Sequence, residues 1–239
     1  MEVVIPTCES FRDTWQPWIA CCRKFWPDRP WPVVLIGFGD MASMPESAGF
    51  DEVRAAERDL GWARNIMHGL RGMDGDDLVL MVLDDFWPSN PVDTEAIKAA
   101  TRLMQRRREV GCFRLQPCPG PAHGIANGDL CGRVPYGVIH RGEPYRVSTQ
   151  PALWRIGFLR RLLGLVTGRG EAWSFENPAG DGPAATWMDE VYSVLREAPQ
   201  PWPLETMNTA VTRGVWNLSA LEFLDEHGIP RPKSGRSIA

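Results

Sequence analysis

The amino-acid sequence predicts an α/β fold, with a mostly parallel mixed sheet and helices on both faces. In the first half of the chain, short apolar runs typical of buried strands alternate with longer stretches of helical periodicity. The apolar runs are unbroken, which is typical of strands that are covered on both faces. The 239 residues, 44% of them hydrophobic, are enough for a single domain with a substantial core.

The first half is expected to contain four strands connected by three helices. The first strand, 2–6, is followed by a helix that runs to about residue 25. The remaining elements, in order, are strand 33–37, helix 51–71 with a break at 60–61, strand 78–83, helix 93–108 and strand 112–115. Parallel sheets bind ligands at the carboxyl ends of their strands, and Asp40, Asp84 and Asp85 all lie at such ends.

The second half is less regular. Residues 117–142 are rich in glycine and proline, and they are expected to form an ordered loop over the binding site. The elements expected after this loop are a strand at 145–148, helices at 151–163 and 183–195, an irregular segment at 206–216 and a helix at 219–227. One domain therefore covers 1–229, divided into 1–116 and 117–229, and residues 230–239 form a flexible tail.

Composition and charge exclude several classes of protein. The longest apolar run, 78–83, is far shorter than the roughly 20 residues that a membrane-spanning helix needs. Glu2 stands where a signal peptide would carry basic charge, so a cytoplasmic protein without a membrane span is expected. The net charge of −4 gives no general attraction to nucleic acids. The six cysteines include no C-x-x-C pair, which indicates free thiols.

Two adjacent carboxylates, Asp84 and Asp85, end the most apolar of the predicted strands. Each carboxylate resists transfer out of water, and each repels the other. A divalent Mg²⁺ or Mn²⁺ with a diphosphate on its far side would offset this cost, because hard cations take oxygen ligands and keep few protein ones. The alternative is that the two aspartates only cap a turn before Pro88.

Four short motifs occur in order within the first part of the chain. The first strand ends in Pro6-Thr7, the second strand ends in an aspartate, and a Gly-x-Ala-Arg-Asn sequence opens a helix before the acidic strand end. This order and spacing resemble the GT-A glycosyltransferases of the family-2-like kind, in the compact soluble form found in bacteria and phages. The resemblance implies a Rossmann-like half that binds a nucleotide-sugar donor. The residues that it assigns to the donor are Pro6, Thr7, Asp40, Arg64, Asn65 and Asp84.

The acidic motif departs from that family in one respect. Its usual form is Asp-x-Asp, whereas the two carboxylates are adjacent here and Phe86 follows them. We expect Asp85 to be the main metal ligand and a catalytic residue, because it lies at the tip of the strand. Asp84 is expected to contact the ribose, or the metal through water.

The resemblance extends more thinly to the second half. The segments 145–154 and 171–176 look like the acceptor side of bacterial and phage sugar transferases. A carboxylate must take the proton of the acceptor hydroxyl in an inverting enzyme, and Glu176 is the candidate base, with Asp189 and Glu190 as rivals. The alternative is that Glu176 has no catalytic role and is a surface residue or a helix cap. Arg213 resembles the C-terminal cation that pairs with the donor diphosphate.

The resemblance implies a metal-dependent transfer of a sugar from a nucleotide-diphosphate sugar to an acceptor hydroxyl, with Mn²⁺ or Mg²⁺ as the cofactor. The acceptor is either a glycan or a hydroxymethylated pyrimidine in phage DNA, in which case the protein acts in the host cytoplasm. A DNA acceptor would need a local basic groove, for which the candidate residues are Arg155, Arg160, Arg161 and Arg169.

Two alternatives stay open: a nucleotidyltransferase and a non-catalytic nucleotide-binding protein. The first generally has a Gly-rich loop with Arg or Lys directly after the first strand, and the segment 7–12 lacks the glycines. The sugar, the acceptor, the stereochemical outcome and the oligomeric state are not predicted.

Overall fold

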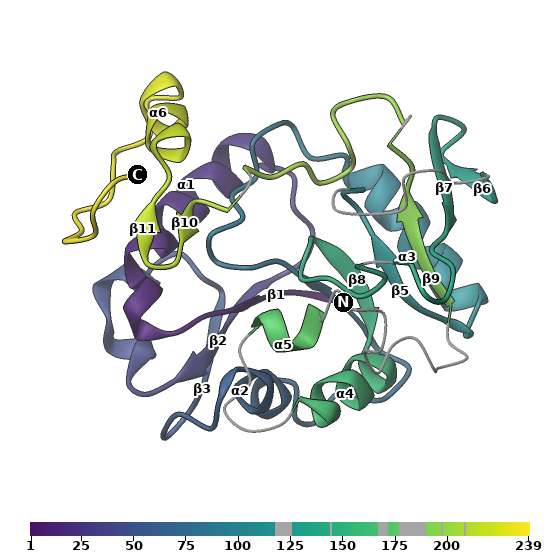
Figure 1. Ribbon diagram of the computed structural model, residues 1–239, viewed down its shortest axis with the longest axis horizontal. Coiled ribbons are helices and arrows are strands. Elements are labelled where there is room, and N and C mark those ends of the chain that lie inside the picture. The colour runs from purple at the N-terminus through teal and green to yellow at the C-terminus, as the bar shows by residue number, and fades with distance from the viewer. Residues whose placement is uncertain (118–125, 144, 167–171, 177–189, 197, 208) are drawn as a thin grey trace.

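The computed structural model describes residues 1–117, 126–143, 145–166, 172–176, 190–196, 198–207 and 209–239. Within these residues, a nine-stranded sheet runs through the centre of the molecule in the order β3-β2-β1-β4-β8-β5-β9-β7-β6 (Figure 1). The strands are β1 (Glu2–Pro6), β2 (Val33–Phe38), β3 (Glu52–Ala56), β4 (Leu78–Met81), β5 (Val110–Arg114), β6 (Gly128–Leu130), β7 (Val134–Val138), β8 (Ala152–Arg155) and β9 (Glu190–Val194).

The sheet is mixed but mostly parallel. Strands β1 to β4 are parallel to one another, and β5 is parallel to β9. Strand β8 lies antiparallel between β4 and β5, and β7 lies antiparallel between β9 and β6. The other seven strands therefore run in one direction, which confirms the predicted α/β class.

Helices cover both faces of the sheet (Figure 1). One core contains residues of α1, α3 and α6, and the other contains residues of α2, α4 and α5. Strand β1 alternates between them, because Val3 and Ile5 enter the first core and Val4 enters the second. The helices are α1 (Trp15–Phe25), α2 (Trp62–Gly69), α3 (Thr94–Arg106), α4 (Ile156–Leu165), α5 (Ala172–Glu176) and α6 (Leu218–Glu226), with 3-10 helices η1 (Glu9–Thr14), η2 (Met41–Ser43) and η3 (Pro45–Ser47).

The expectation of a helix over 51–71 is wrong for the first part of that range. Residues Glu52–Ala56 form β3, which pairs in parallel with β2 at the edge of the sheet. An edge strand keeps part of its side chains in contact with water, so it carries charged residues and lacks the apolar run by which a buried strand is recognised. The helical part begins after Gly61, whose φ of 90° breaks the chain direction before α2.

The second half differs more from expectation. Residues 151–163 form β8 followed by α4, not one helix, because 152–155 pair with β4 and β5 on both sides. Residues 190–194 form β9 where a helix was expected, and the rest of 183–195 up to residue 189 lies outside the described residues. The loop at 117–142 contains the β6–β7 hairpin, and 145–148 form turns where a strand was expected. Pairing with distant strands determines the structure of 152–155 and 190–194.

Helix α3 begins with a side-chain N-cap at Asp93, the first residue of the helix expected over 93–108. The Asp93 side chain accepts a hydrogen bond from the backbone amide of Ala96 at 3.0 Å, which satisfies one of the free amides of the first turn. The described cysteines, Cys8, Cys21, Cys22, Cys112 and Cys131, are free thiols as expected. No helix among the described residues is both long enough and apolar enough to cross a bilayer.

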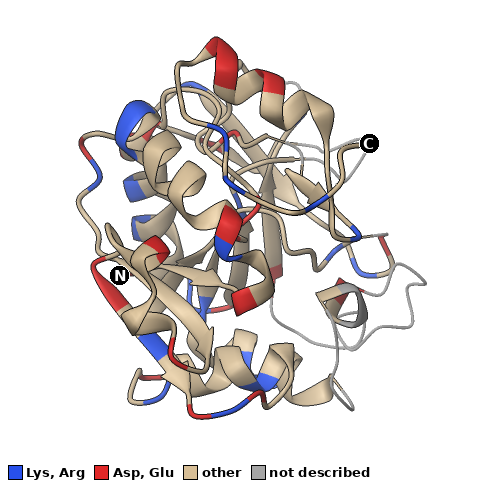
Figure 2. Cartoon of the chain, turned by 90° about the vertical axis from the view of Figure 1, so that its left-hand side faces the viewer, with Lys and Arg blue, Asp and Glu red and all other residues tan. Residues whose placement is uncertain are grey.

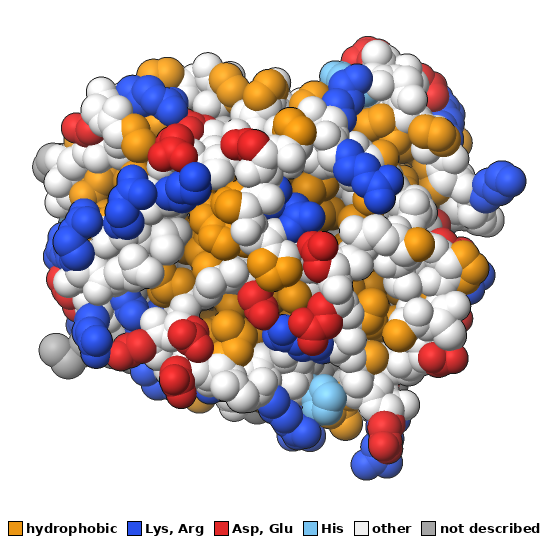
Figure 3. Space-filling view, turned by 180° about the vertical axis from the view of Figure 1, so that it is seen from behind, with side chains coloured by type: hydrophobic (Ala, Val, Ile, Leu, Met, Phe, Trp, Pro, Cys, Tyr) orange, Lys and Arg blue, Asp and Glu red, His pale blue; other side chains and the backbone are white. Residues whose placement is uncertain are grey.

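Charged side chains of both signs are interspersed over the molecule. Figure 2 shows both basic and acidic residues on the helices and loops of this side. In Figure 3, basic side chains occur over much of the face, several acidic ones lie near its lower centre, and apolar groups lie between them. The dispersed charge agrees with the net charge of −4 and does not mark a nucleic-acid surface on these faces.

Candidate active site

The acidic pair lies where parallel α/β sheets bind their ligands. Asp84 and Asp85 follow β4 at the carboxyl end of the parallel strands, and each is only 6% exposed. Thr7 follows β1 at the same edge, and its backbone amide donates to the carbonyl of Ile36 in β2 at 2.9 Å. The structure therefore brings the predicted Pro6-Thr7 strand end next to the predicted metal ligands.

Asp84 is held by a chain of two hydrogen bonds. The indole Nε1 of Trp15 donates to Oγ1 of Thr7 at 2.8 Å, and the Thr7 hydroxyl donates to Oδ2 of Asp84. An indole nitrogen can only donate, so Trp15 occupies an acceptor site of the hydroxyl and directs its proton toward the carboxylate. The backbone carbonyl of Asp84 also accepts a bond from Nε1 of Trp87 at 3.2 Å.

Asp85 is held by a segment from the far end of the chain. The backbone amide of Ala210 donates to the carbonyl of Asp85 at 2.9 Å, and the amide of Val211 bonds to its carboxylate. These two residues begin a small hairpin formed by β10 (Val211–Thr212) and β11 (Val215–Trp216). The sequence pointed to this segment through Arg213, but it did not indicate that Ala210 and Val211 contact Asp85.

The two carboxylates are electrostatically unfavourable without a cation. Burial raises the pKa of Asp85 to about 7, against the smaller opposing effects of backbone hydrogen bonds and of Arg236. Burial, and then the charge of Asp85, raise the pKa of Asp84 well above its usual range, although the Thr7 hydroxyl opposes this. Shifts of this size at the ligand-binding edge of a sheet are typical of functional sites.

The donor set fits a divalent cation that shares its coordination with a substrate. The described residues include no cluster of three or more His, Cys, Asp or Glu that could form an all-protein site. Mg²⁺ and, by the same oxygen-ligand chemistry, Mn²⁺ are commonly held by one or two carboxylates together with substrate phosphates. Asp84 and Asp85 provide such a pair.

Glu176, the predicted base, lies at the same edge of the sheet. Its Oε1 accepts hydrogen bonds from the backbone amide and, at 2.6 Å, from Oγ1 of Thr149. Thr149 lies three residues before the start of β8, in which Ala152 pairs with Met81 at the end of β4. The antiparallel course of β8 thus places Glu176 on the side of the acidic pair. Its rivals differ, because Glu190 pairs with Arg107 at 3.1 Å and Asp189 lies outside the described residues.

The other predicted donor residues have different surroundings. Asp40 is exposed and accepts a hydrogen bond from Ser43 at 2.6 Å, and Arg64 is exposed on α2. Asn65 is buried, and its side-chain amide bonds to Asp59 and to the backbone of residue 60, so it shapes the turn before α2. Arg213 is exposed at the tip of the β10–β11 hairpin, where its φ of 51° forms the turn together with Gly214. The donor roles of these four residues stay predictions.

The expected basic groove is not formed by the arginines proposed for it. Arg155 is 6% exposed and donates to main-chain carbonyls, among them those of Val110 and Met104. Arg160 likewise donates to the carbonyls of Leu70 and Met73. Arg161 is exposed on α4. Arg169 lies outside the described residues.

Sequence reasoning missed one cation of the site, Arg236. It lies in the segment that was expected to be a flexible tail, yet its charge acts on both aspartates and favours their ionised forms. Composition gave no signal for it, because a lone arginine among polar residues near a terminus is usually solvated.

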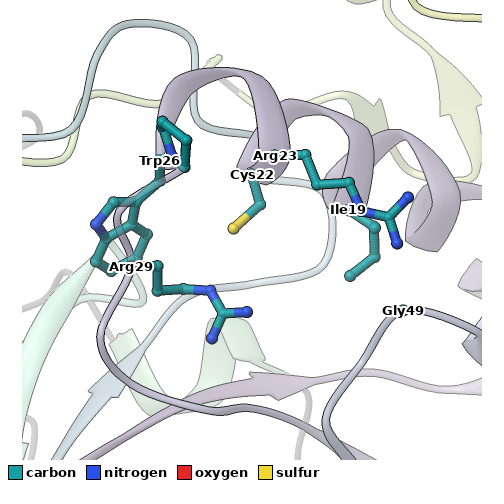
Figure 4. Close-up of a pocket in the computed structure, with 7 residues that line it drawn as sticks. Ile19, Cys22, Arg23, Trp26, Arg29 and Gly49 are labelled. Atoms are coloured by element: carbon teal, nitrogen blue, oxygen red, sulfur yellow. The ribbon is translucent and has the colours of Figure 1, made fainter.

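A separate pocket of about 240 Å³ lies near the end of α1 (Figure 4). Its lining includes Ile19, Trp26 and the arginines Arg23 and Arg29. Helix α1 begins close to Thr7 and is about 16 Å long, so this pocket lies at the opposite edge of the sheet from the acidic pair. Arg29 is paired with Asp51 at 3.2 Å, so its charge is balanced within the chain.

No family model and no curated protein matches the chain. Among solved structures it is similar to a nucleotidyl transferase from Methanothermobacter thermautotroptrophicus, with a TM-score of 0.50 and 16% sequence identity over 94% of each chain. At this identity the likeness concerns the fold. The chain therefore has an α/β fold that is also found in a nucleotidyl transferase.

Proposed function

We propose that the chain is a metal-dependent transferase that holds the phosphates of a nucleotide against Asp84 and Asp85. The observation that carries this proposal is the buried acidic pair, which Thr7 and Val211 hold at the carboxyl ends of the strands. Carboxylates that only capped a turn would remain in water, where they avoid the cost of burial. These two are buried side by side, so a cation that offsets their repulsion is the simplest physical reason for the arrangement.

The residues of the chain would act as follows in sugar transfer. Thr7 and Val211 hold the two carboxylates toward the phosphates, and Glu176 accepts the proton of the acceptor hydroxyl. The hydroxyl oxygen forms a bond to the anomeric carbon as the bond from that carbon to the phosphate oxygen breaks, and the nucleoside diphosphate leaves. A bound Mg²⁺ or Mn²⁺ would stabilise the charge of the departing diphosphate. The acceptor, a glycan or modified DNA, stays a prediction.

The loop after β1 favours sugar transfer. Nucleotidyl transfer generally uses a Gly-rich basic loop at this point to hold a triphosphate, whereas residues 9–14 form the glycine-free helix η1. The one basic residue there, Arg12, lies 3.7 Å from Glu9 and 3.9 Å from Glu46, so acidic partners surround it.

The likeness in fold favours the second candidate, nucleotidyl transfer. A phosphate oxygen of the substrate would then bond to the α-phosphorus of a nucleoside triphosphate, and pyrophosphate would leave. The same acidic pair would serve this reaction, because in both reactions the leaving group is a phosphate group whose charge a metal ion can stabilise.

We expect the chain to bind one class of nucleotide only when a divalent cation is present. Thermal unfolding would be measured with nucleoside diphosphates, nucleotide-sugars and nucleoside triphosphates, each with Mn²⁺ or with EDTA. A ligand at 100 times its Kd raises the free energy of unfolding by about 2.7 kcal/mol, or roughly 5–10 °C in Tm. Release of a nucleoside diphosphate from a nucleotide-sugar then identifies sugar transfer, and pyrophosphate release from a triphosphate with a sugar phosphate identifies nucleotidyl transfer. No Tm shift with any nucleotide would contradict the proposal.

Replacement of Thr7 by Val is expected to weaken Mn²⁺ binding about 10-fold or more. Valine has nearly the same shape but cannot donate to Asp84, and loss of a group that orients a metal ligand typically costs 10–100-fold in metal affinity. Calorimetric titration of Mn²⁺ into the protein mixed with the nucleotide would measure the affinity. The matched control is Thr101→Val, since the hydroxyl of Thr101 donates to the helix carbonyl of Ile97 and contacts the sulfur of Met1, and neither group belongs to the site. Equal affinities of the two variants would show that the hydroxyl does not orient the site.

A further inference from the structure

The last ten residues, 230–239, are bound to the body of the protein, and we call them the C-terminal strap. The amide of Trp216 donates to the carbonyl of Ser237, and the amide of Ala239 donates back to the carbonyl of Trp216, both at 2.9 Å. Ile238 thereby forms a parallel bridge with Trp216. In Figure 1 this yellow end of the chain lies beside α6 and the β10–β11 hairpin.

Arg236 is the most strongly engaged residue of the strap. Its guanidinium binds both carboxylate oxygens of Asp13, at 2.6 and 3.0 Å, and donates to the backbone carbonyl of Ser10. It also lies over the ring of Phe11 at 4.6 Å from the centroid. Both charged side chains are largely buried, with 13% of Arg236 and 11% of Asp13 exposed.

The same guanidinium reaches the hairpin. Its Nη1 donates to the carbonyl of Gly214 at 3.4 Å, and the group lies 6.0 Å from the ring of Trp216. Arg236 therefore contacts two segments that are far apart in sequence, residues 10–13 and the β10–β11 hairpin.

Each of these two segments holds one of the aspartates. The segment that contains residues 10–13 begins at Thr7 and continues into Trp15, the two residues that hold Asp84. The hairpin begins at Ala210 and Val211, the two residues that hold Asp85. Arg236 joins the supports of the two carboxylates at a point from which its charge also acts on both of them.

We infer that Arg236 is a positioning residue for the acidic pair: it clamps the two supporting segments together, so that the C-terminal strap forms part of the active site. The inference rests on the proposed function, because it concerns the geometry in which Asp84 and Asp85 share a cation. Two carboxylates from adjacent residues bind one cation only in a narrow range of relative positions. If the two supporting segments moved independently, the carboxylates would leave that range of positions while the sheet stayed folded.

Lysine at this position distinguishes clamping from charge alone. A lysine keeps the positive charge, but it cannot bind both oxygens of Asp13 while it also donates to the carbonyls of Ser10 and Gly214 and stacks on Phe11. Clamping therefore predicts that Arg236→Lys resembles Arg236→Gln. An effect of charge alone predicts that Arg236→Lys resembles the unmodified chain.

The test compares Mn²⁺ affinity in the presence of the nucleotide that stabilises the unmodified chain, measured at 20 °C, with Tm in EDTA as a measure of folding. Arg236→Gln, Arg236→Lys and Asp13→Asn are each expected to weaken Mn²⁺ binding about 10–100-fold. The double variant Asp13→Asn/Arg236→Gln should lose little more than either single variant, because the two side chains act as one unit. The matched control is Arg231→Gln, which removes an exposed strap arginine that is paired with Asp225.

Several outcomes would overturn the inference. Arg236→Gln with unchanged Mn²⁺ affinity would show that the strap does not position the aspartates, even though the unmodified chain binds metal and nucleotide. If Arg236→Lys kept the full Mn²⁺ affinity, the positive charge alone would explain the effect of Arg236, and the clamp would be wrong. If the unmodified chain bound neither metal nor nucleotide, the proposed function would fail and this inference with it.

Discussion

Replacement of Asp85 by Asn is expected to remove the metal-dependent response to nucleotides and to reduce turnover at least 100-fold. Asparagine keeps the shape of the side chain and an oxygen that can accept the hydrogen bond of Val211, so the hairpin should stay in place. It lacks the charge that makes a carboxylate a strong ligand of a hard cation. The measurements are Tm with nucleotide and Mn²⁺, and release of the nucleotide product.

The same replacement is expected to make the chain more stable in the absence of ligands. Burial raises the pKa of Asp85 to about 7 in the folded protein, above its ordinary value near 3.9 in the unfolded chain. Its ionisation therefore disfavours folding, and the penalty grows as pH rises from about 4 to about 7 and is constant above that. We expect Asp85→Asn to gain about 2 kcal/mol at pH 8, or roughly 4–8 °C in Tm, and to gain little at pH 4.

Loss of function combined with gain of stability is the signature that separates a strained binding site from a turn cap. The control is Asp74→Asn, which changes an exposed aspartate before β4 and should alter neither property. An Asp85→Asn chain that was less stable at pH 8 and still responded to Mn²⁺ and nucleotide would show that the carboxylate supports the turn. Sites built for a ligand are often destabilising without it, because their groups are placed for binding.

The parts of the fold that could be predicted from sequence are those that local pattern determines. The runs at 3–6 and 78–81 are apolar throughout, since strands buried on both faces need such residues, and both lie in central strands. The segments 152–155 and 190–194 are strands because they lie between distant partners. Residues 190–194 do contain strand-favouring Val and Tyr, but the distant partners of the two segments are not evident from the local sequence.

The candidate site divides in the same way. Asp84, Asp85 and Thr7 could be found because each ends a recognisable strand, and parallel strands bring their ends together. Val211 and Arg236 could not be found, because they reach the site through contacts that span more than 100 residues. Arg155 was misinterpreted for a related reason. Sequence shows that an arginine is present but not whether its guanidinium meets water or main-chain carbonyls.

Arg155 is expected to be among the most important residues for stability. Its guanidinium donates to the carbonyls of Met104 and Arg107 at the end of α3, where helix carbonyls lack partners within the helix. It also donates to the carbonyl of Val110 at the start of β5 and to that of Asp76 before β4. One buried side chain thus connects the end of a helix to the beginnings of two strands.

Replacement of Arg155 by Met is expected to lower the free energy of unfolding by about 3 kcal/mol, or roughly 6–12 °C in Tm. Methionine fills the space of the apolar stem but takes the guanidinium donors away from the carbonyls of the buried residues Met104 and Val110, and a buried carbonyl without a donor costs about 1–3 kcal/mol. The control is Arg102→Met on the exposed face of α3, which should change stability by less than about 0.5 kcal/mol. Urea denaturation would measure the free energy of unfolding of both variants. If Arg155→Met lost no more than Arg102→Met, the carbonyls would be hydrogen-bonded to water once the arginine is removed.

Because Arg155 lies at the edge of the sheet opposite the acidic pair, the Met variant should keep its metal-dependent nucleotide binding below its lowered Tm, whereas Asp85→Asn keeps its fold and loses that binding.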